Sequence, residues 1–296
     1  RNIWCLSGLS VGPLLFLLFI NDLPDTIASS IRLFADDLII YREVTSVDDT
    51  ILLQNDSTKM ENWCRDSHMQ INVQKTVHMR FRKKRIASTL YSLSGSPLQT
   101  VSEYKYLGVF LTSSMCWHRH IDYVTAKACK MLGFLRRNTK VFPQQARDLL
   151  YKSYVRPILE YGCTVWDPPT NADCDELERV QKMAARYVIG SYGRNLSITA
   201  TKETLKWELL EKRRQILRLK LFHNIYHGHI GIDRNQYILQ PDYVSRRTDH
   251  ELKVREYSCR TNLFKGNFFP KTISEWNRLP AGKVSIIDND AFAAAL

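Results

Sequence analysis

Residues 31–41 read IRLFADDLIIY and place two adjacent acids, Asp36 and Asp37, between two apolar runs. Apolar runs on either side of a short polar stretch predict a β-hairpin, with strands at 30–34 and 38–42 and the acids at its tip. Neighbouring carboxylates repel each other unless a cation lies between them. Mg²⁺ binds one or two carboxylates together with the phosphates of its substrate, and two such ions about 4 Å apart can stabilise a phosphoryl transfer. A solvated turn is the alternative interpretation.

Three further stretches accompany this hairpin in a fixed order. Residues 8–23 read GLSVGPLLFLLFINDL and precede it, whereas residues 69–81 read MQINVQKTVHMRF and residues 104–109 read YKYLGV after it. In order and spacing, the four stretches resemble the reverse transcriptases of LINE-like, non-LTR retrotransposons, most closely the jockey-like elements. The residues that carry the resemblance are Gly12 to Phe16, Ile20 to Leu23, Phe34 to Asp37, Asn72, Lys75, Thr76 and Tyr106 to Gly108.

The resemblance implies a reaction and roles for individual residues. The reaction is the addition of deoxynucleotides to a DNA primer along an RNA template, with Mg²⁺, or alternatively Mn²⁺, held by Asp36 and Asp37. Lys75 matches a lysine that protonates or neutralises the pyrophosphate, although a salt bridge at a sheet edge explains this residue equally well. The nucleotide- and primer-binding residues that the resemblance implies are Gly8, Phe34, Ala35, Tyr106, Leu107 and Gly108.

The start of the chain departs from the family pattern. Only seven residues precede Gly8, whereas the family carries another metal-binding Asp on an earlier strand. The triplet Ser7-Gly8-Leu9 occupies the place of the usual Gln-Gly-Ser. We therefore expect a C-terminal palm and thumb fragment whose partner is the upstream fingers and palm segment. We expect the 296 residues alone to polymerise weakly or not at all.

The periodicity of the chain, taken with the resemblance, predicts an α+β fold in three parts. Residues 1–112 are expected to form a partial polymerase palm, in which Ser46 to Asp49 resembles a capping box that opens a helix over 47–68. The palm would also contain strands at 70–81 and 104–111 and a short hairpin near Ser94 to Pro97. Residues 113–228 are expected to form a helical thumb or connector, which ends in a long basic helix over 202–227, because apolar residues recur at helical spacing there. Residues 229–296 are expected to form an irregular segment with an aromatic cluster that docks on the helices.

Charge is distributed unevenly along the chain, whose formal net charge is +12. Residues 1–79 hold 6 Lys or Arg and 10 Asp or Glu, whereas residues 80–296 hold 36 and 20. A basic body after an acidic catalytic piece is typical of a protein that binds a phosphate backbone, although solubility alone can explain basic charge. The candidate backbone contacts are Arg80, Arg82, Lys83, Lys84, Lys127 and Lys130.

Several other classes of function find no support in the sequence. The seven cysteines form no Cys-x-x-Cys pair and no zinc spacing with a histidine, which favours reduced thiols in the nucleus or the cytoplasm. The apolar run Val11 to Ile20 is shorter than the roughly 20 residues that span a bilayer, so we expect a buried helix of the palm and no membrane partner.

Three hypotheses remain open at this point. The chain is a polymerase segment, a nucleic-acid-binding remnant without catalysis, or a helical scaffold for protein interactions. Mg²⁺-dependent primer extension separates the first two, and salt-sensitive binding separates the second from the third.

Overall fold

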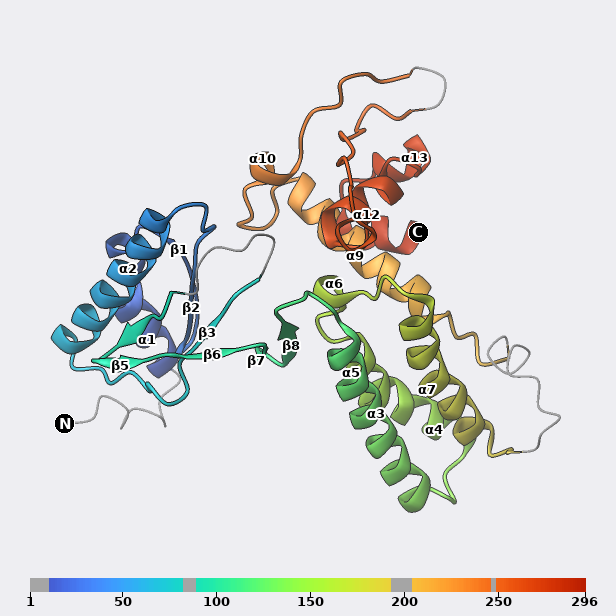
Figure 1. Cartoon of the computed structure of the whole chain (residues 1–296). Coiled ribbons are helices and arrows are strands. Elements are labelled where there is room, and N and C mark those ends of the chain that lie inside the picture. The colour runs from blue at the N-terminus through green and yellow to red at the C-terminus, as the bar shows by residue number, and fades with distance from the viewer. Residues whose placement is uncertain (1–10, 82–88, 193–203, 246–248) are drawn as a thin grey trace. The chain divides into compact units, whose positions relative to one another are not determined.

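The computed structural model describes residues 11–81, 89–192, 204–245 and 249–296 (Figure 1). The chain divides into two compact units, Arg1–Tyr104 and Lys105–Leu296, which we treat separately. Helices and strands occur together, as expected for an α+β protein. Among the described residues, no helix combines the length and the apolar character needed to cross a membrane.

Unit 1 combines small two-stranded sheets with two helices. β1 pairs with β2 and β4 with β5 in antiparallel fashion, whereas β3 and β6 are parallel. The unit 1 elements are α1 (Gly12–Ile20), η2 (Leu23–Thr26), β1 (Ser30–Phe34), β2 (Asp37–Tyr41), α2 (Val47–Asp66), β3 (Val77–Met79), β4 (Ser92–Leu93), β5 (Ser96–Pro97) and β6 (Gln99–Val101).

The predicted hairpin and the predicted long helix of unit 1 are both confirmed. β1 and β2 pair from Ser30 opposite Tyr41 to Phe34 opposite Asp37. At the start of α2, the Ser46 hydroxyl accepts the backbone N–H of Asp49 while the Asp49 carboxylate accepts the N–H of Ser46, which is the predicted capping box. The predicted hairpin at Ser94 is also present as β4 and β5. These elements depend on local residue patterns, and this explains why the sequence predicts them.

The expectation of a buried helix at α1 is wrong for most of its length. Only Ile20 is buried, whereas Leu14, Leu17 and Leu18 are 58%, 54% and 67% exposed. The helix is apolar on every side. The side that carries Phe16 and Ile20 packs on the core of unit 1. The opposite side has no apolar partner among the residues that the structure describes.

Two predicted strands need correction. Over 70–81, only Val77–Met79 forms a strand, because Asn72 closes a turn that occupies the residues before it. The predicted strand 104–111 is a hairpin of β7 (Glu103–Tyr106) and β8 (Val109–Thr112). The chain reverses between these strands because two consecutive residues adopt left-handed backbone angles.

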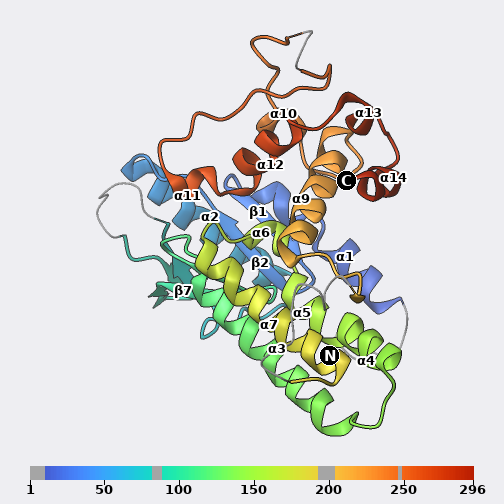
Figure 2. The ribbon, with the colours of Figure 1, turned by 90° about the vertical axis from the view of Figure 1, so that its right-hand side faces the viewer.

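Unit 2 is almost entirely helical after β8. The long helices α3 and α7 pack along each other (Figure 2). The helical elements are α3 (His118–Asn138), α4 (Gln144–Leu150), the π-helical turn η3 (Tyr151–Val155), α5 (Arg156–Glu160), α6 (Cys163–Trp166), α7 (Asn171–Ile189), α9 (Leu210–Tyr226), α10 (Arg234–Tyr237), α11 (Asn262–Lys265), α12 (Phe268–Trp276), α13 (Ala281–Val284) and α14 (Asn289–Ala295).

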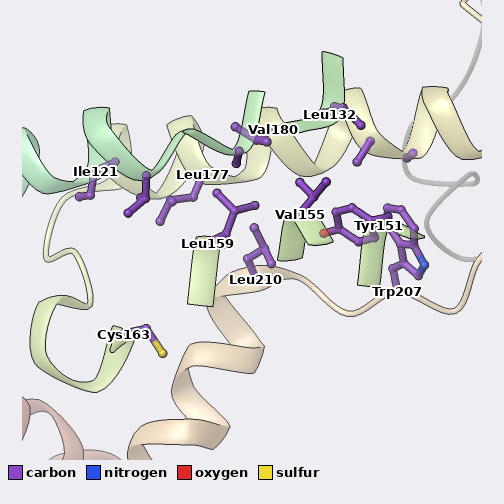
Figure 3. Packing of buried hydrophobic residues seen from close by; sticks show 14 of the residues in the cluster. Ile121, Leu132, Tyr151, Val155, Leu159, Cys163, Leu177, Val180, Trp207 and Leu210 are labelled. Atoms are coloured by element: carbon purple, nitrogen blue, oxygen red, sulfur yellow. The ribbon is translucent and has the colours of Figure 1, made fainter. Parts of the chain in front are cut away.

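The first core of unit 2 confirms the apolar stripe predicted for α3. Its residues recur at intervals of three and four and face α5, α7 and the start of α9 (Figure 3). The stripe residues, all buried, are Ile121, Val124, Ala128, Leu132 and Leu135.

The second core of unit 2 gathers around α9. Phe222 of α9 packs with Ile273 and Trp276 of α12 and with Phe292 of α14. The sequence predicts an irregular segment over 229–296. The structure instead has the helices α11 to α14 within residues 262–295. The predicted helix over 202–227 is also shorter, because α9 begins at Leu210 and residues 202–203 lie outside the described part of the chain.

A buried ion cluster fastens α9 to its neighbours. Asp167, which follows α6, accepts Nε–H of Arg214 at 2.7 Å and lies 3.0 Å from Nε of Arg218. Lys271 of α12 also binds this carboxylate. Burial alone would raise the pKa of Asp167, but the charges of Arg218 and Lys271 outweigh burial and lower it.

Candidate functional site

The two candidate metal ligands lie at the tip of the β1–β2 hairpin. Phe34 pairs with Asp37, so Ala35 and Asp36 form a two-residue turn. Ala35 has φ +51° while Asp36 does not have a positive φ, which is the pattern of a type II′ turn. Glycine usually takes the first position of such a turn, so Ala35 holds its positive φ at the cost of backbone strain.

Both carboxylates of the tip are available to a ligand. Asp36 and Asp37 are exposed, and neither side-chain carboxylate has a hydrogen bond or ion pair with any described residue. Phe34 beside them is 62% exposed. Mg²⁺ takes only one or two carboxylates from a protein and completes its shell with water and substrate phosphates. The donor set at the tip fits that requirement, although the described residues contain no group of three or more His, Cys, Asp or Glu that could hold a metal.

Asp56 of α2 anchors the chain that enters the hairpin. Its buried carboxylate accepts the backbone N–H groups of Ala28 and Ser29 at 3.1 and 2.7 Å. Burial by itself would raise the pKa of Asp56, but these hydrogen bonds lower it overall, so the side chain stays ionised. This role of Asp56 was not predicted from the sequence. The signal was an acid four residues before Met60, on the apolar side of the helix.

Lys75 lies in the turn that precedes β3. The backbone N–H of Lys75 donates to Oδ1 of Asn72 at 3.1 Å, and the Thr76 hydroxyl donates to the Asn72 carbonyl at 2.9 Å. The Asn-x-x-Lys-Thr pattern therefore has a structural cause, because the asparagine closes the turn that presents the lysine. The Lys75 side chain is exposed.

The predicted primer-binding residues form the turn between β7 and β8. Leu107 has φ +45° and Gly108 has φ +85°, as a type I′ turn requires. The Tyr161 hydroxyl donates to the Leu107 carbonyl at 3.1 Å, and its ring would lie 3.1 Å from a Cβ added at Gly108. Glycine at this position therefore serves both the turn and the close approach of the Tyr161 ring. Tyr106 is partly buried at the end of β7.

A pocket of about 300 Å³ lies beside this turn in unit 2. Lys105 donates to the Tyr123 hydroxyl at 2.8 Å, and this hydrogen bond is the largest of the effects that lower the pKa of Tyr123. Lys127 of α3 also lines the pocket, so residues that the sequence predicted separately meet here. None of Lys105, Tyr123 and Tyr161 was predicted as a site residue, although Lys105 lies within the quoted stretch 104–109. The lining residues are Lys105, Leu107, Gly108, Tyr123, Val124, Lys127, Ile158 and Tyr161.

The other basic candidates are dispersed. Lys130 is exposed on α3, one turn beyond Lys127 but outside the lining of the pocket. Arg80 is half-buried after β3. Burial is the main cause that lowers the pKa of His78, and the charge of Arg80 lowers it further. The predicted residues Gly8, Arg82, Lys83 and Lys84 lie outside the described residues.

The chain is similar to known proteins over part of its length. Residues 4–111 match the family described as reverse transcriptase (RNA-dependent DNA polymerase). The chain is 25% identical over 194 residues to the probable RNA-directed DNA polymerase from transposon X-element of Drosophila melanogaster, covering 62% of this chain and 21% of the relative. It is 24% identical over 198 residues to the RNA-directed DNA polymerase from mobile element jockey of the same species, covering 62% and 22%.

A third relative extends the similarity to another element. The retrovirus-related Pol polyprotein from type-1 retrotransposable element R1 of Bradysia coprophila is 25% identical over 174 residues, covering 55% of this chain and 17% of the relative. Residues 4–111 thus match the reverse transcriptase family, and the similar proteins named here come from transposons and retrotransposable elements, which supports a LINE-like reverse transcriptase. The chain spans about a fifth of the length of the curated relatives it matches.

Proposed function

We propose that this chain supplies the carboxylate hairpin and part of the primer-holding surface of an RNA-directed DNA polymerase. The observation that carries the proposal is the pair Asp36 and Asp37, two exposed acids without a protein partner among the described residues, at the tip of a strained turn. In this proposal, unit 1 corresponds to part of the palm and the helices of unit 2 to the thumb or connector. The similarity of residues 4–111 to reverse transcriptases supports this assignment.

The proposed reaction is attack of a primer 3′-hydroxyl on the α-phosphate of a deoxynucleotide, with pyrophosphate as the leaving group. Bound Mg²⁺ would supply charge stabilisation for the phosphoryl transfer. Asp36 and Asp37 are the residues that would hold it, Asp36 as the main ligand. Ala35 leaves space for the primer end, and Lys75 offers a positive charge or a proton to the pyrophosphate.

The pocket beside the β7–β8 turn suits the sugar-phosphate backbone of a primer. Lys105 and Lys127 bring two positive charges to its lining, and Tyr123 and Tyr161 bring aromatic rings. Cationic side chains on helices contact phosphates without reading sequence. RNA template, DNA primer and deoxynucleotides are the proposed ligands, and an upstream fingers and palm segment is the proposed protein partner.

Primer extension on an RNA template tests the proposal. The 296 residues alone are expected to polymerise weakly or not at all, so the assay supplies the upstream fingers and palm segment. We then expect extension that requires Mg²⁺ and falls by at least about 100-fold in Asp36→Ala, because the metal held by this side chain stabilises charge that develops in the transition state. Asp66→Ala, an exposed acid at the end of α2, is the matched control and should leave extension unchanged. Measurable extension that is equal in Asp36→Ala and the unsubstituted chain would contradict the assignment.

The second candidate is polynucleotide binding without catalysis, which the excess of basic residues over 80–296 favours. Under this alternative, the chain binds RNA or DNA with an affinity that falls steeply as salt rises, and Asp36→Ala leaves that affinity unchanged. Binding in the absence of any extension, under conditions where an upstream segment is supplied, would favour this candidate over the polymerase.

A further inference from the structure

One side chain contacts both residues of the turn between β7 and β8. Tyr161 directly follows α5, and its hydroxyl donates to the carbonyl oxygen of Leu107 at 3.1 Å. Its ring lies against Gly108, because a Cβ added there would be only 3.1 Å from Cε1 of the ring. The hydroxyl therefore restrains the first residue of the turn, and the ring restrains the second.

The turn needs such a restraint because its backbone is strained. Leu107 has φ +45°, a region that leucine rarely adopts, whereas glycine adopts the φ of +85° at Gly108 freely. Strain of this kind persists only where the surrounding structure enforces it, and it is concentrated at functional sites. The carbonyl of the residue before the two central residues of a β-turn accepts the hydrogen bond that closes the turn. The Leu107 carbonyl is not that acceptor, so it is available to the Tyr161 hydroxyl.

Tyr161 is itself fixed to the helical core of unit 2. Its backbone carbonyl accepts Nε1–H of Trp166 at 2.8 Å, and Trp166 is fully buried. Leu159, two residues before Tyr161, is also fully buried. The Tyr161 side chain is 60% exposed, but the backbone that carries it is anchored on both sides. The position of the hydroxyl is therefore set by the core rather than by the turn that it contacts.

Tyr161 also lines the pocket that we assign to the primer backbone. Lys105 and Lys127 bring positive charge to this lining, and Leu107 and Gly108 bring the turn. A change in the direction of the turn would change the wall of the pocket. The contacts of Tyr161 with the turn therefore decide which shape of pocket a primer meets.

We propose that Tyr161 is a positioning residue that fixes the direction of the β7–β8 turn toward the primer. This role rests on the proposed function, because it lies within the proposed primer-holding surface. Tyr161 does not act on the reacting atoms. It holds one conformation of the turn before the primer binds, and such preorganisation raises affinity because binding then orders fewer groups. The same restraint keeps the primer end in place, and a misplacement of about 1 Å can lower a reaction rate by about 100-fold.

Binding of a labelled DNA primer on an RNA template to the full chain tests this role without catalysis. Tyr161→Phe removes the hydroxyl and keeps the ring against Gly108, so the turn is free to take several directions. We expect the affinity for the primer–template duplex to fall about three- to tenfold, as when about a third to a tenth of the molecules hold the competent turn. Tyr161→Ala removes the ring as well and should weaken binding further.

Steady-state extension distinguishes a positioning role from a merely structural one. With the upstream segment supplied, Tyr161→Phe should raise KM for the primer–template about three- to tenfold and leave KM for the deoxynucleotide unchanged. The denaturant midpoint of Tyr161→Phe should stay unchanged, because the lost hydrogen bond is exposed and water can replace it. A lower midpoint with equal changes in both KM values would indicate a structural role and would overturn the proposal.

Tyr154→Phe is the matched control. Tyr154 is 55% exposed, close to the 60% of Tyr161, and its hydroxyl has no hydrogen bond to any residue that the structure describes. This control removes the same atom from a tyrosine outside the pocket, and it should leave duplex affinity and both KM values unchanged. Circular dichroism of each variant verifies that it is folded.

The outcomes of these measurements separate the role of Tyr161 from the polymerase proposal. Equal duplex affinity in the unsubstituted chain, Tyr161→Phe and Tyr154→Phe would overturn the role of Tyr161 and leave that of Asp36 untouched. Weaker duplex binding by Tyr161→Phe, together with extension that ignores Asp36→Ala, would support the role of Tyr161 and refute the metal site. Absence of duplex binding by the chain would overturn the primer-holding surface and the role of Tyr161 with it.

Discussion

Unit 1 and unit 2 differ in how completely they bury their apolar side chains. Both units bury charge: Arg214 and Arg218 of unit 2 are 0% and 2% exposed and share the carboxylate of Asp167, and Asp56 of unit 1 is 1% exposed. In unit 1, leucines of α1 remain more than half exposed. The comparison teaches that the unit with the candidate metal ligands is the less completely packed one. In unit 1, the hydrogen bonds of Asp56 fix the chain that enters the hairpin.

The largest effect is expected at the buried ion cluster of unit 2. Asp167→Ala leaves Arg214 and Arg218 buried without their shared acid, and removal of one partner of a buried pair costs about 3–5 kcal/mol of unfolding free energy. Denaturant unfolding followed by circular dichroism measures the loss. Asp290→Ala, which breaks the exposed pair with Lys220, is the control and should cost less than about 1 kcal/mol. Similar costs for the two variants would show that unit 2 does not depend on its buried charges.

An intermediate effect is expected at the anchor of unit 1. Asp56→Asn keeps the shape of the side chain but removes the charge that accepts the N–H groups of Ala28 and Ser29. The expected cost is about 1–3 kcal/mol. Because folding lowers the pKa of Asp56, its contribution is fully present above the unfolded value of about 3.9 and disappears as the pH falls through the folded value.

Unfolding of both proteins between neutral and acidic pH measures this contribution. The difference in unfolding free energy between the unsubstituted chain and Asp56→Asn should be constant near neutral pH and should shrink below about pH 4. A difference that stays constant into strong acid would mean that the ionised carboxylate does not hold the hairpin.

The smallest effect, and one of opposite sign, is expected at the turn of the hairpin. Ala35→Gly relieves the left-handed strain of about 1–2 kcal/mol and adds chain entropy to the unfolded state, so we expect a net stabilisation of about 0.5–1 kcal/mol. Ala126→Gly, at an exposed site in α3, should instead destabilise unit 2 by about 1 kcal/mol. Destabilisation by both substitutions would show that the turn at Ala35 is unstrained.

The sequence predicts features whose causes lie within a few neighbouring residues. The capping box at Ser46 and the turn around Ala35 and Asp36 follow from local chemistry, so both were predictable. The turn at Leu107 was missed because leucine rarely adopts a left-handed angle, and only Gly108 after it signals the reversal. Tyr161 could not be predicted, because its contact with Leu107 joins residues 54 positions apart and depends on the packing of α5.

The exposed leucines of α1 have a practical consequence for the laboratory. The apolar side chains of Leu14, Leu17 and Leu18 form an exposed stripe on α1. The hydrophobic effect favours any contact that removes this stripe from water. Purified protein would adhere through this stripe to resin, plastic or chaperones, irrespective of how well the helical unit is folded. A mild detergent that covers α1 would then recover monodisperse protein. This recovery would show that the exposed leucines of α1 cause the adhesion.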